Sequence, residues 1–175
     1  MRNNVNTEAI YGFEKEIYNN LSVSEKEESI SGSWNFDNEV GQFKAHVKSE
    51  FGNAIMLSDN KTSLGGNGVQ PSPMQYILFG IASGFVGALV NKAALNNYHI
   101  QDIKVKAVAS TNYDMFFSIE ERNPVEKLTI TANIYSDEDV HGLLKLKNDI
   151  MDCCPPLSLI KKDNIEVIIN VRKSS

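Results

Sequence analysis

The chain has 175 residues, enough for one domain with a hydrophobic core and too few for two ordinary domains. Its hydrophobic content of 42% and charged content of 22% are typical of globular proteins and argue against disorder along the whole chain. The formal net charge of −5 argues against a nucleic-acid partner, because broad contact with phosphates needs a basic surface.

The first predicted element is an amphipathic helix over Thr7–Leu21. Apolar residues recur there at helical spacing with Glu and Lys between them. Asn6 or Thr7 is a suitable N-cap, and the polar segment up to Ser29 resembles a linker. We therefore expect residues 1–29 to form a helix and linker that precede a domain over residues 30–175. The apolar positions of the helix are Ile10, Phe13, Ile17 and Leu21.

From Ile30 the apolar period changes to two, which predicts β-strands. One strand begins at Ile30 and a second at Phe43, with a turn at Asp37–Gly41 between them. The sequence Phe51-Gly52-Asn53-Ala54 predicts a tight turn, because Gly and Asn tolerate positive φ, and a third strand follows over Ala54–Leu57. An antiparallel meander is the simplest arrangement of these strands.

The uncharged segment Met74–Val90 predicts a long helix. It is shorter than a bilayer normally requires and contains polar residues and glycines, so we expect a helix buried in protein and no membrane partner. Ser72 can act as its N-cap and Pro73 as its first residue, where a missing N–H has no cost. Gly80 and Gly84 lie on one face, where a second helix backbone can approach closely.

The rest of the chain predicts strands over Ile103–Ala109, Leu128–Ile134 and Ile165–Val171, with a helix between the last two. Ser136 and Asp139 have the spacing of a capping box at the start of that helix. Strands that occur in runs, rather than in strict alternation with helices, favour the α+β class.

The last turn of this helix reaches the adjacent Cys153 and Cys154, and Pro155-Pro156 ends it. Two adjacent cysteines do not form a disulfide framework, and Met1–Asn20 lacks the apolar segment of a secretory signal, so we expect a cytoplasmic protein. On general grounds both cysteines are expected to be small buried hydrophobes. His46, His99 and His141 are scattered, so a metal site is not expected. No cofactor is expected either.

Four features in this order resemble the OsmC/Ohr family: Gly65-Gly66, Pro71-Ser72-Pro73, the apolar helix and Cys154-Pro155. The resemblance covers roughly residues 30–172. Family members reduce organic hydroperoxides with two cysteines and act in oxidative stress. The resemblance implies an α+β fold in which antiparallel sheets wrap around two central helices. It also implies an intertwined homodimer with active sites at the dimer interface.

The sequence departs from the family at the residues that carry the chemistry. Gly84 occupies the position of the peroxidatic cysteine, and Met74 that of a glutamate that follows the first proline of the helix. The family's arginine commonly comes from the loop between the first two strands, and Asp37–Gly41 contains none. Of the four groups that the family's chemistry needs, only the resolving cysteine has a counterpart in this sequence, Cys154.

Peroxide reduction needs a thiolate, and glycine has no nucleophile, so the usual two-cysteine cycle is not expected. Two functional hypotheses remain open. In the first, thiol-dependent reduction of a hydroperoxide, or sulfur chemistry, persists at Cys154 with help from Cys153 or an external thiol. The negative end of a helix dipole raises the pKa of a thiol at the helix C-terminus, which argues against a reactive thiolate at Cys154. In the second, the chain is an inactive dimeric scaffold that binds a small hydrophobic or thiol-containing ligand at the dimer interface.

Overall fold

The computed structural model of the protein describes residues 1–37, 41–160 and 162–173. The chain divides into two compact units. One comprises Met1–Lys15 with Leu78–Ser175, and the other comprises Glu16–Ile77. The turn expected at Asp37–Gly41 lies mostly outside the described residues. A domain boundary between residues 29 and 30 stays a prediction.

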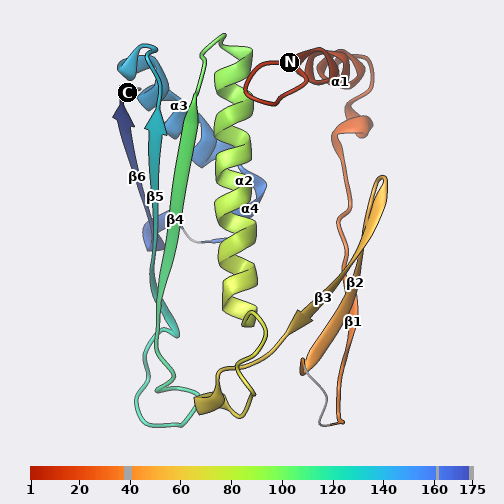
Figure 1. Ribbon diagram of the computed structural model, residues 1–175, viewed down its shortest axis with the longest axis vertical. Coiled ribbons are helices and arrows are strands. Elements are labelled where there is room, and N and C mark those ends of the chain that lie inside the picture. Colours follow the sequence, from red (N-terminus) through yellow and green to blue (C-terminus); the bar gives the residue numbers. More distant parts are fainter. Residues whose placement is uncertain (38–40, 161, 174–175) are drawn as a thin grey trace. The chain divides into compact units, whose positions relative to one another are not determined.

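The unit formed by Glu16–Ile77 contains an antiparallel sheet in the order β1-β2-β3, which confirms the predicted meander (Figure 1). Its strands are β1 (Ser31–Trp34), β2 (Phe43–Ser49) and β3 (Gly52–Ser58). The prediction of a turn at residues 51–54 is wrong by two residues, because the turn lies at residues 49–52. Ser49 pairs with Gly52, so the loop is Glu50-Phe51, and neither Gly52 nor Asn53 has a positive φ.

Helix α2 (Pro73–Leu95) begins as predicted. The Ser72 hydroxyl accepts a hydrogen bond from the Gln75 backbone N–H at 3.3 Å, and the Gln75 side chain accepts one from the Ser72 N–H at 2.8 Å. This reciprocal pair is a capping box, which satisfies two N–H groups that a helix start otherwise leaves free.

The expectation that α2 is too short to span a membrane is wrong, because it runs five residues beyond Val90. Among the described residues it is the one helix long and apolar enough for a span, with a mean hydropathy of 1.6 over a window that is 28% buried. The buried residues of α2 form a stripe along one face. Through this stripe α2 is the core helix of the unit that contains residues 78–175. The stripe consists of Ile81, Phe85, Leu89, Ala93 and Ala94.

The unit formed by residues 1–15 and 78–175 contains the second sheet, in the order β4-β5-β6 (Figure 1). Strands β4 (Asp102–Thr111) and β5 (Val125–Tyr135) are antiparallel. Strand β6 (Ile165–Arg172) pairs with β5 in parallel, so the expectation of purely antiparallel sheets is wrong here. The chain between β5 and β6 passes through a helix, and such a crossover returns the strand in the same direction.

Helix α3 (Val140–Cys153) makes that crossover and is followed by the short helix α4 (Pro155–Ser158). Its N-cap is Asp139, which accepts hydrogen bonds from the N–H groups of His141 and Gly142 at 3.3 and 2.8 Å. The predicted role of Ser136 as the cap is therefore wrong. Its hydroxyl instead donates to the His99 carbonyl at 2.6 Å.

The core of this unit packs α2 and α3 against the sheet. Phe85 and Leu89 of α2 and Ile150 of α3 are fully buried. The sheet contributes alternate residues of β5, as the period of two predicts. These residues are Leu128, Ile130, Ala132 and Ile134.

Helix α1 (Thr7–Asn19) confirms the predicted N-terminal helix, although it ends two residues before Leu21. Asn6 is the cap, because its side chain accepts a hydrogen bond from the Ala9 N–H at 3.2 Å. The preceding arm is anchored by Asn3. Its amide donates to the Tyr98 carbonyl at 2.9 Å and accepts from the Ile100 N–H at 3.0 Å.

Candidate functional site

Helices α2 and α4 approach each other closely at the position where the family resemblance places the peroxidatic cysteine. A Cβ atom added to Gly84 would lie 2.6 Å from Cγ of Pro156 and 3.2 Å from its Cβ. Real Cβ atoms essentially never lie within 3.0 Å of a non-bonded heavy atom. The proline ring therefore fills the space that a cysteine side chain at position 84 would need. Gly84 allows a close approach, as predicted, but the partner is a proline ring rather than a helix backbone. The prediction is wrong for Gly80, where an added Cβ atom would meet nothing within 4 Å.

Cys154 lies two residues before Pro156, at the junction of α3 and α4. It is 2% exposed. Its N–H donates to the Ile150 carbonyl at 2.9 Å, and its carbonyl accepts hydrogen bonds from the N–H groups of Leu157 and Ser158, each at 3.1 Å. The end of one helix and the start of the next thus fix its backbone.

Burial raises the pKa of the Cys154 thiol. The Leu157 backbone lowers this pKa and the neighbouring Cys153 raises it further. The predicted direction is therefore confirmed, but its main cause is desolvation rather than a helix C-terminus. Cys153 is exposed, so the expectation that both cysteines are buried is wrong for this residue. Adjacent residues near a helix end point to different sides, and only one of the two can face the core.

Met74, which stands where the family has a glutamate, is the second residue of α2 and is half-buried. It belongs to the unit Glu16–Ile77, whereas Gly84, Cys154 and Pro156 belong to the other unit. The structure therefore brings together Gly84 and the Cys154–Pro156 segment. A thioether has no charge and cannot pair with an arginine as a glutamate does. Among the described residues there is no group of three or more His, Cys, Asp or Glu that could hold a metal ion.

Sequence reasoning missed Asp59, which organises the glycine-rich loop before α2. Asp59 is 1% exposed, and its carboxylate accepts hydrogen bonds from the N–H groups of Asn67, at 3.0 and 3.2 Å, and Val69, at 3.4 Å. Gly66 packs directly on the Asn60 backbone, where a Cβ atom would overlap the Asn60 carbonyl. The backbone of this loop is thus held by a buried carboxylate and by close packing of Gly66 on Asn60. An aspartate next to a glycine-rich run is the sequence signal that could have revealed it.

Comparison with solved structures places the fold among the OsmC-like and organic hydroperoxide resistance proteins, which confirms the α+β class and the resemblance at the level of the fold. No family model and no curated protein matches the sequence.

Three solved structures illustrate the match. An OsmC-like protein of unknown function from Vibrio cholerae is 12% identical, with a TM-score of 0.65 over 85% of this chain and 100% of that protein. An organic hydroperoxide resistance protein from Elizabethkingia anophelis is 19% identical, with a TM-score of 0.60 over 86% and 99%. A protein from Legionella pneumophila, described as an organic hydroperoxide resistance protein OsmC and a predicted redox protein, is 18% identical, with a TM-score of 0.56 over 83% and 96%.

Proposed function

We propose that the chain is a cytoplasmic, homodimeric relative of the OsmC/Ohr proteins that does not use their two-cysteine peroxide cycle. In this proposal it acts as a scaffold that binds a small hydrophobic or thiol-containing ligand at the dimer interface. The observation that carries the proposal is the packing of Pro156 on Gly84, which leaves no volume for a side chain at the position of the peroxidatic cysteine.

The state of Cys154 supports the loss of the cycle. The thiolate is the reactive form of a cysteine, and burial that raises the pKa of the Cys154 thiol decreases the thiolate fraction at neutral pH. The 2% exposure also keeps a hydroperoxide from reaching the sulfur. Both effects act against Cys154 as a replacement nucleophile.

The proposed dimer is supported by the sheet β1-β2-β3, which buries few of its own side chains. Among the described residues of these strands, Ala45 and Ser58 are the buried ones. Large apolar side chains such as Trp34 and Ile55 are 47% and 60% exposed. A three-stranded sheet needs an apolar face packed against something else for stability, and a second copy of the chain supplies such a surface in an intertwined dimer.

A peroxidase assay tests the loss of the cycle. Purified protein is mixed with cumene hydroperoxide and either dithiothreitol or a dihydrolipoyl donor, with Cys154→Ser as the control. We expect peroxide consumption equal to that of Cys154→Ser. Robust turnover that depends on Cys154 would overturn the proposal.

The dimer and its ligand are tested separately. We expect a solution mass twice the 19.5 kDa of one chain by light scattering, and a shift toward one chain in Phe79→Glu, because Phe79 is 69% exposed on α2. Calorimetry with cumene hydroperoxide and thiophenol should detect binding to the dimer and none to Phe79→Glu. A monomeric wild-type protein, or equal binding to both, would contradict an interfacial site.

The exposure of Cys153 favours a second candidate, in which one cysteine reduces peroxide with an external thiol. The Cys153 thiolate would attack the O–O bond, which releases an alcohol and leaves a sulfenic acid. Two external thiols would then reduce the sulfenic acid to the thiol and water, and would themselves be joined in a disulfide. Cys153→Ser in the same assay decides this. Turnover that disappears in Cys153→Ser and persists in Cys154→Ser would establish this candidate instead.

A further inference from the structure

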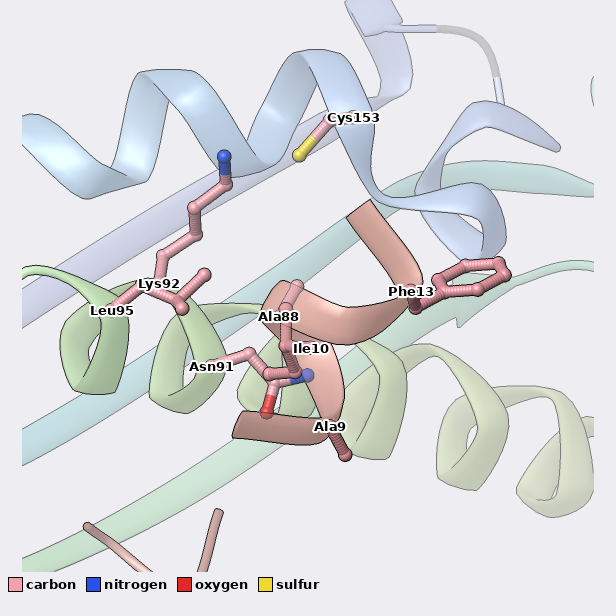
Figure 2. Close-up of a pocket in the computed structure, with 8 residues that line it drawn as sticks. All are labelled: Ala9, Ile10, Phe13, Ala88, Asn91, Lys92, Leu95 and Cys153. Carbon is pink, nitrogen blue, oxygen red and sulfur yellow. The ribbon is translucent and has the colours of Figure 1, made fainter. Parts of the chain in front are cut away.

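A second feature of the unit formed by residues 1–15 and 78–175 is a cavity of about 550 Å³ between α1, α2 and the end of α3, referred to below as the α1 cavity (Figure 2). This volume lies in the range of small-molecule sites, which are concave and mostly apolar with a few polar groups. Ile10 and Phe13 line it from α1, and Ala88 and Leu95 line it from α2. These side chains form a hydrocarbon surface.

The polar groups of the α1 cavity gather on α2 and α3. Lys92 is the one lysine, arginine, aspartate or glutamate of the lining, and the amide of Asn91 and the sulfur of Cys153 accompany it. Figure 2 shows the Lys92 side chain extending from α2 toward the end of α3 that carries Cys153. Lys92 takes part in none of the ion pairs between described residues. Lys92 as a residue is half-buried, and an ammonium group beside apolar walls attracts a ligand that has both an anionic group and a hydrocarbon part.

The fold holds the α1 wall in place. The Asn3 side chain makes two hydrogen bonds to the backbone of Tyr98 and Ile100, just after α2, and the Arg2 guanidinium donates to the Asn97 carbonyl. The arm that leads into α1 is therefore attached at three backbone groups of the segment that α2 leads into. This attachment keeps Ile10 and Phe13 over α2.

We propose that the α1 cavity binds an organic anion with an apolar body, such as a medium-chain carboxylate. The carboxylate pairs with the Lys92 ammonium group, and the hydrocarbon chain lies between Ile10 and Phe13 of α1 and Ala88 and Leu95 of α2. Because every wall comes from one protomer, this binding does not depend on the proposed dimer or on its interfacial ligand.

Calorimetry with octanoate and octanol tests the pairing, because the two compounds share a hydrocarbon chain and differ in charge. We expect octanoate to bind the full chain and Lys92→Gln to weaken that binding at least tenfold, with Lys92→Arg close to wild type. Octanol should bind wild type and Lys92→Gln alike. Lys145→Gln, which removes an exposed charge on α3 outside the cavity, is the matched control and should bind octanoate as wild type does.

A second variant blocks the volume without removing charge. Ala9 is exposed on α1 and lines the cavity, so Ala9→Trp fills its mouth with little disturbance of the fold. We expect it to abolish octanoate binding while retaining the wild-type melting temperature. Phe79→Glu should retain octanoate binding even as a monomer, which separates this site from the interfacial one.

Cys153 provides an independent readout, because it lies in the same lining as Lys92. We expect octanoate to slow its alkylation by iodoacetamide. The ratio of the alkylation rates with anionic iodoacetate and neutral iodoacetamide should fall several-fold in Lys92→Gln, whereas exposure alone would leave the ratio unchanged. The carboxylate of Asp152, next to Cys153 in the chain, repels iodoacetate in wild type and in Lys92→Gln alike, so it does not cause the difference between the two proteins. No octanoate binding by folded wild-type protein, or equal binding by wild type and Lys92→Gln, would overturn the proposal.

Discussion

The ring of Pro156 packs against Gly84, so that position 84 of α2 has no room for a side chain larger than hydrogen. Gly84→Ala should therefore destabilise the protein by about 1–2 kcal/mol, because a strained core contact outweighs the gain in helix propensity. Chemical denaturation checks this. Gly87→Ala is the matched control, since a Cβ atom there meets nothing within 4 Å and should leave stability equal or higher.

The same contact predicts coupling between the two positions. Pro156→Ala removes the ring atoms that a side chain at position 84 would strike, so the double variant should be more stable than the sum of the single changes predicts, by about 1 kcal/mol. Strict additivity would contradict the contact. It also follows that Gly84→Cys alone does not restore a cysteine pair with Cys154 without displacing Pro156.

Alkaline pH should destabilise the folded protein through Cys154. Because burial raises the pKa of this thiol in the folded state, the unfolded chain loses the proton first, and stability falls as pH rises above the ordinary thiol value of 9.0. Urea denaturation at pH 7.5 and pH 10 should show a larger loss for wild type than for Cys154→Ala. Cys153→Ala should lose nearly as much stability as wild type, because burial rather than Cys153 is the largest cause of the raised pKa of Cys154. An equal loss in wild type, Cys154→Ala and Cys153→Ala would contradict the effect.

Asp59 should be needed for the loop that precedes α2. Asp59→Asn replaces a carboxylate oxygen by an N–H donor that faces the N–H groups of Asn67 and Val69. We expect a loss of about 1–3 kcal/mol in the free energy of unfolding, the usual cost of buried donors without partners. Asp149→Asn on the exposed face of α3 should change stability by less than about 0.5 kcal/mol.

Asn3 should control the attachment of the N-terminal arm. Asn3→Ala removes both hydrogen bonds to the backbone of Tyr98 and Ile100, so the Ile100 amide and the amides of α1 should exchange with deuterium faster. Asn4→Ala is the matched control, because Asn4 also has a positive φ, 61° against 52° for Asn3, and none of the described side-chain hydrogen bonds involves it. Equal acceleration in both variants would attribute the effect to backbone strain.

Local features of the fold were predictable from the sequence. Ser72 and Pro73 identify the start of α2 because a cap involves residues a few positions apart. The alternation of apolar residues likewise located β5 and β6. Their parallel pairing was not predictable from alternation, since the period of a strand is the same in either direction.

For the candidate site, the sequence allowed the relevant positions in the chain to be predicted but not the contacts between them. The family resemblance identified Gly84 and Cys154, but the contact of Gly84 with Pro156 joins residues 72 positions apart and depends on how α4 leaves α3. The different environments of Cys153 and Cys154 depend on that same geometry. The α1 cavity combines three helices that no sequence pattern relates to one another.

The adjacent cysteines allow local opening of the core to be measured from the rates at which their two thiols react. Cys153 is exposed and should react with a thiol reagent within the mixing time of an experiment, whereas Cys154, at 2% exposure, should react only when the core between α3 and α4 opens. The rate of the Cys154 reaction then reports how often this part of the core opens. The reaction of Cys153 in the same protein supplies the reference rate, so no label has to be added to the chain.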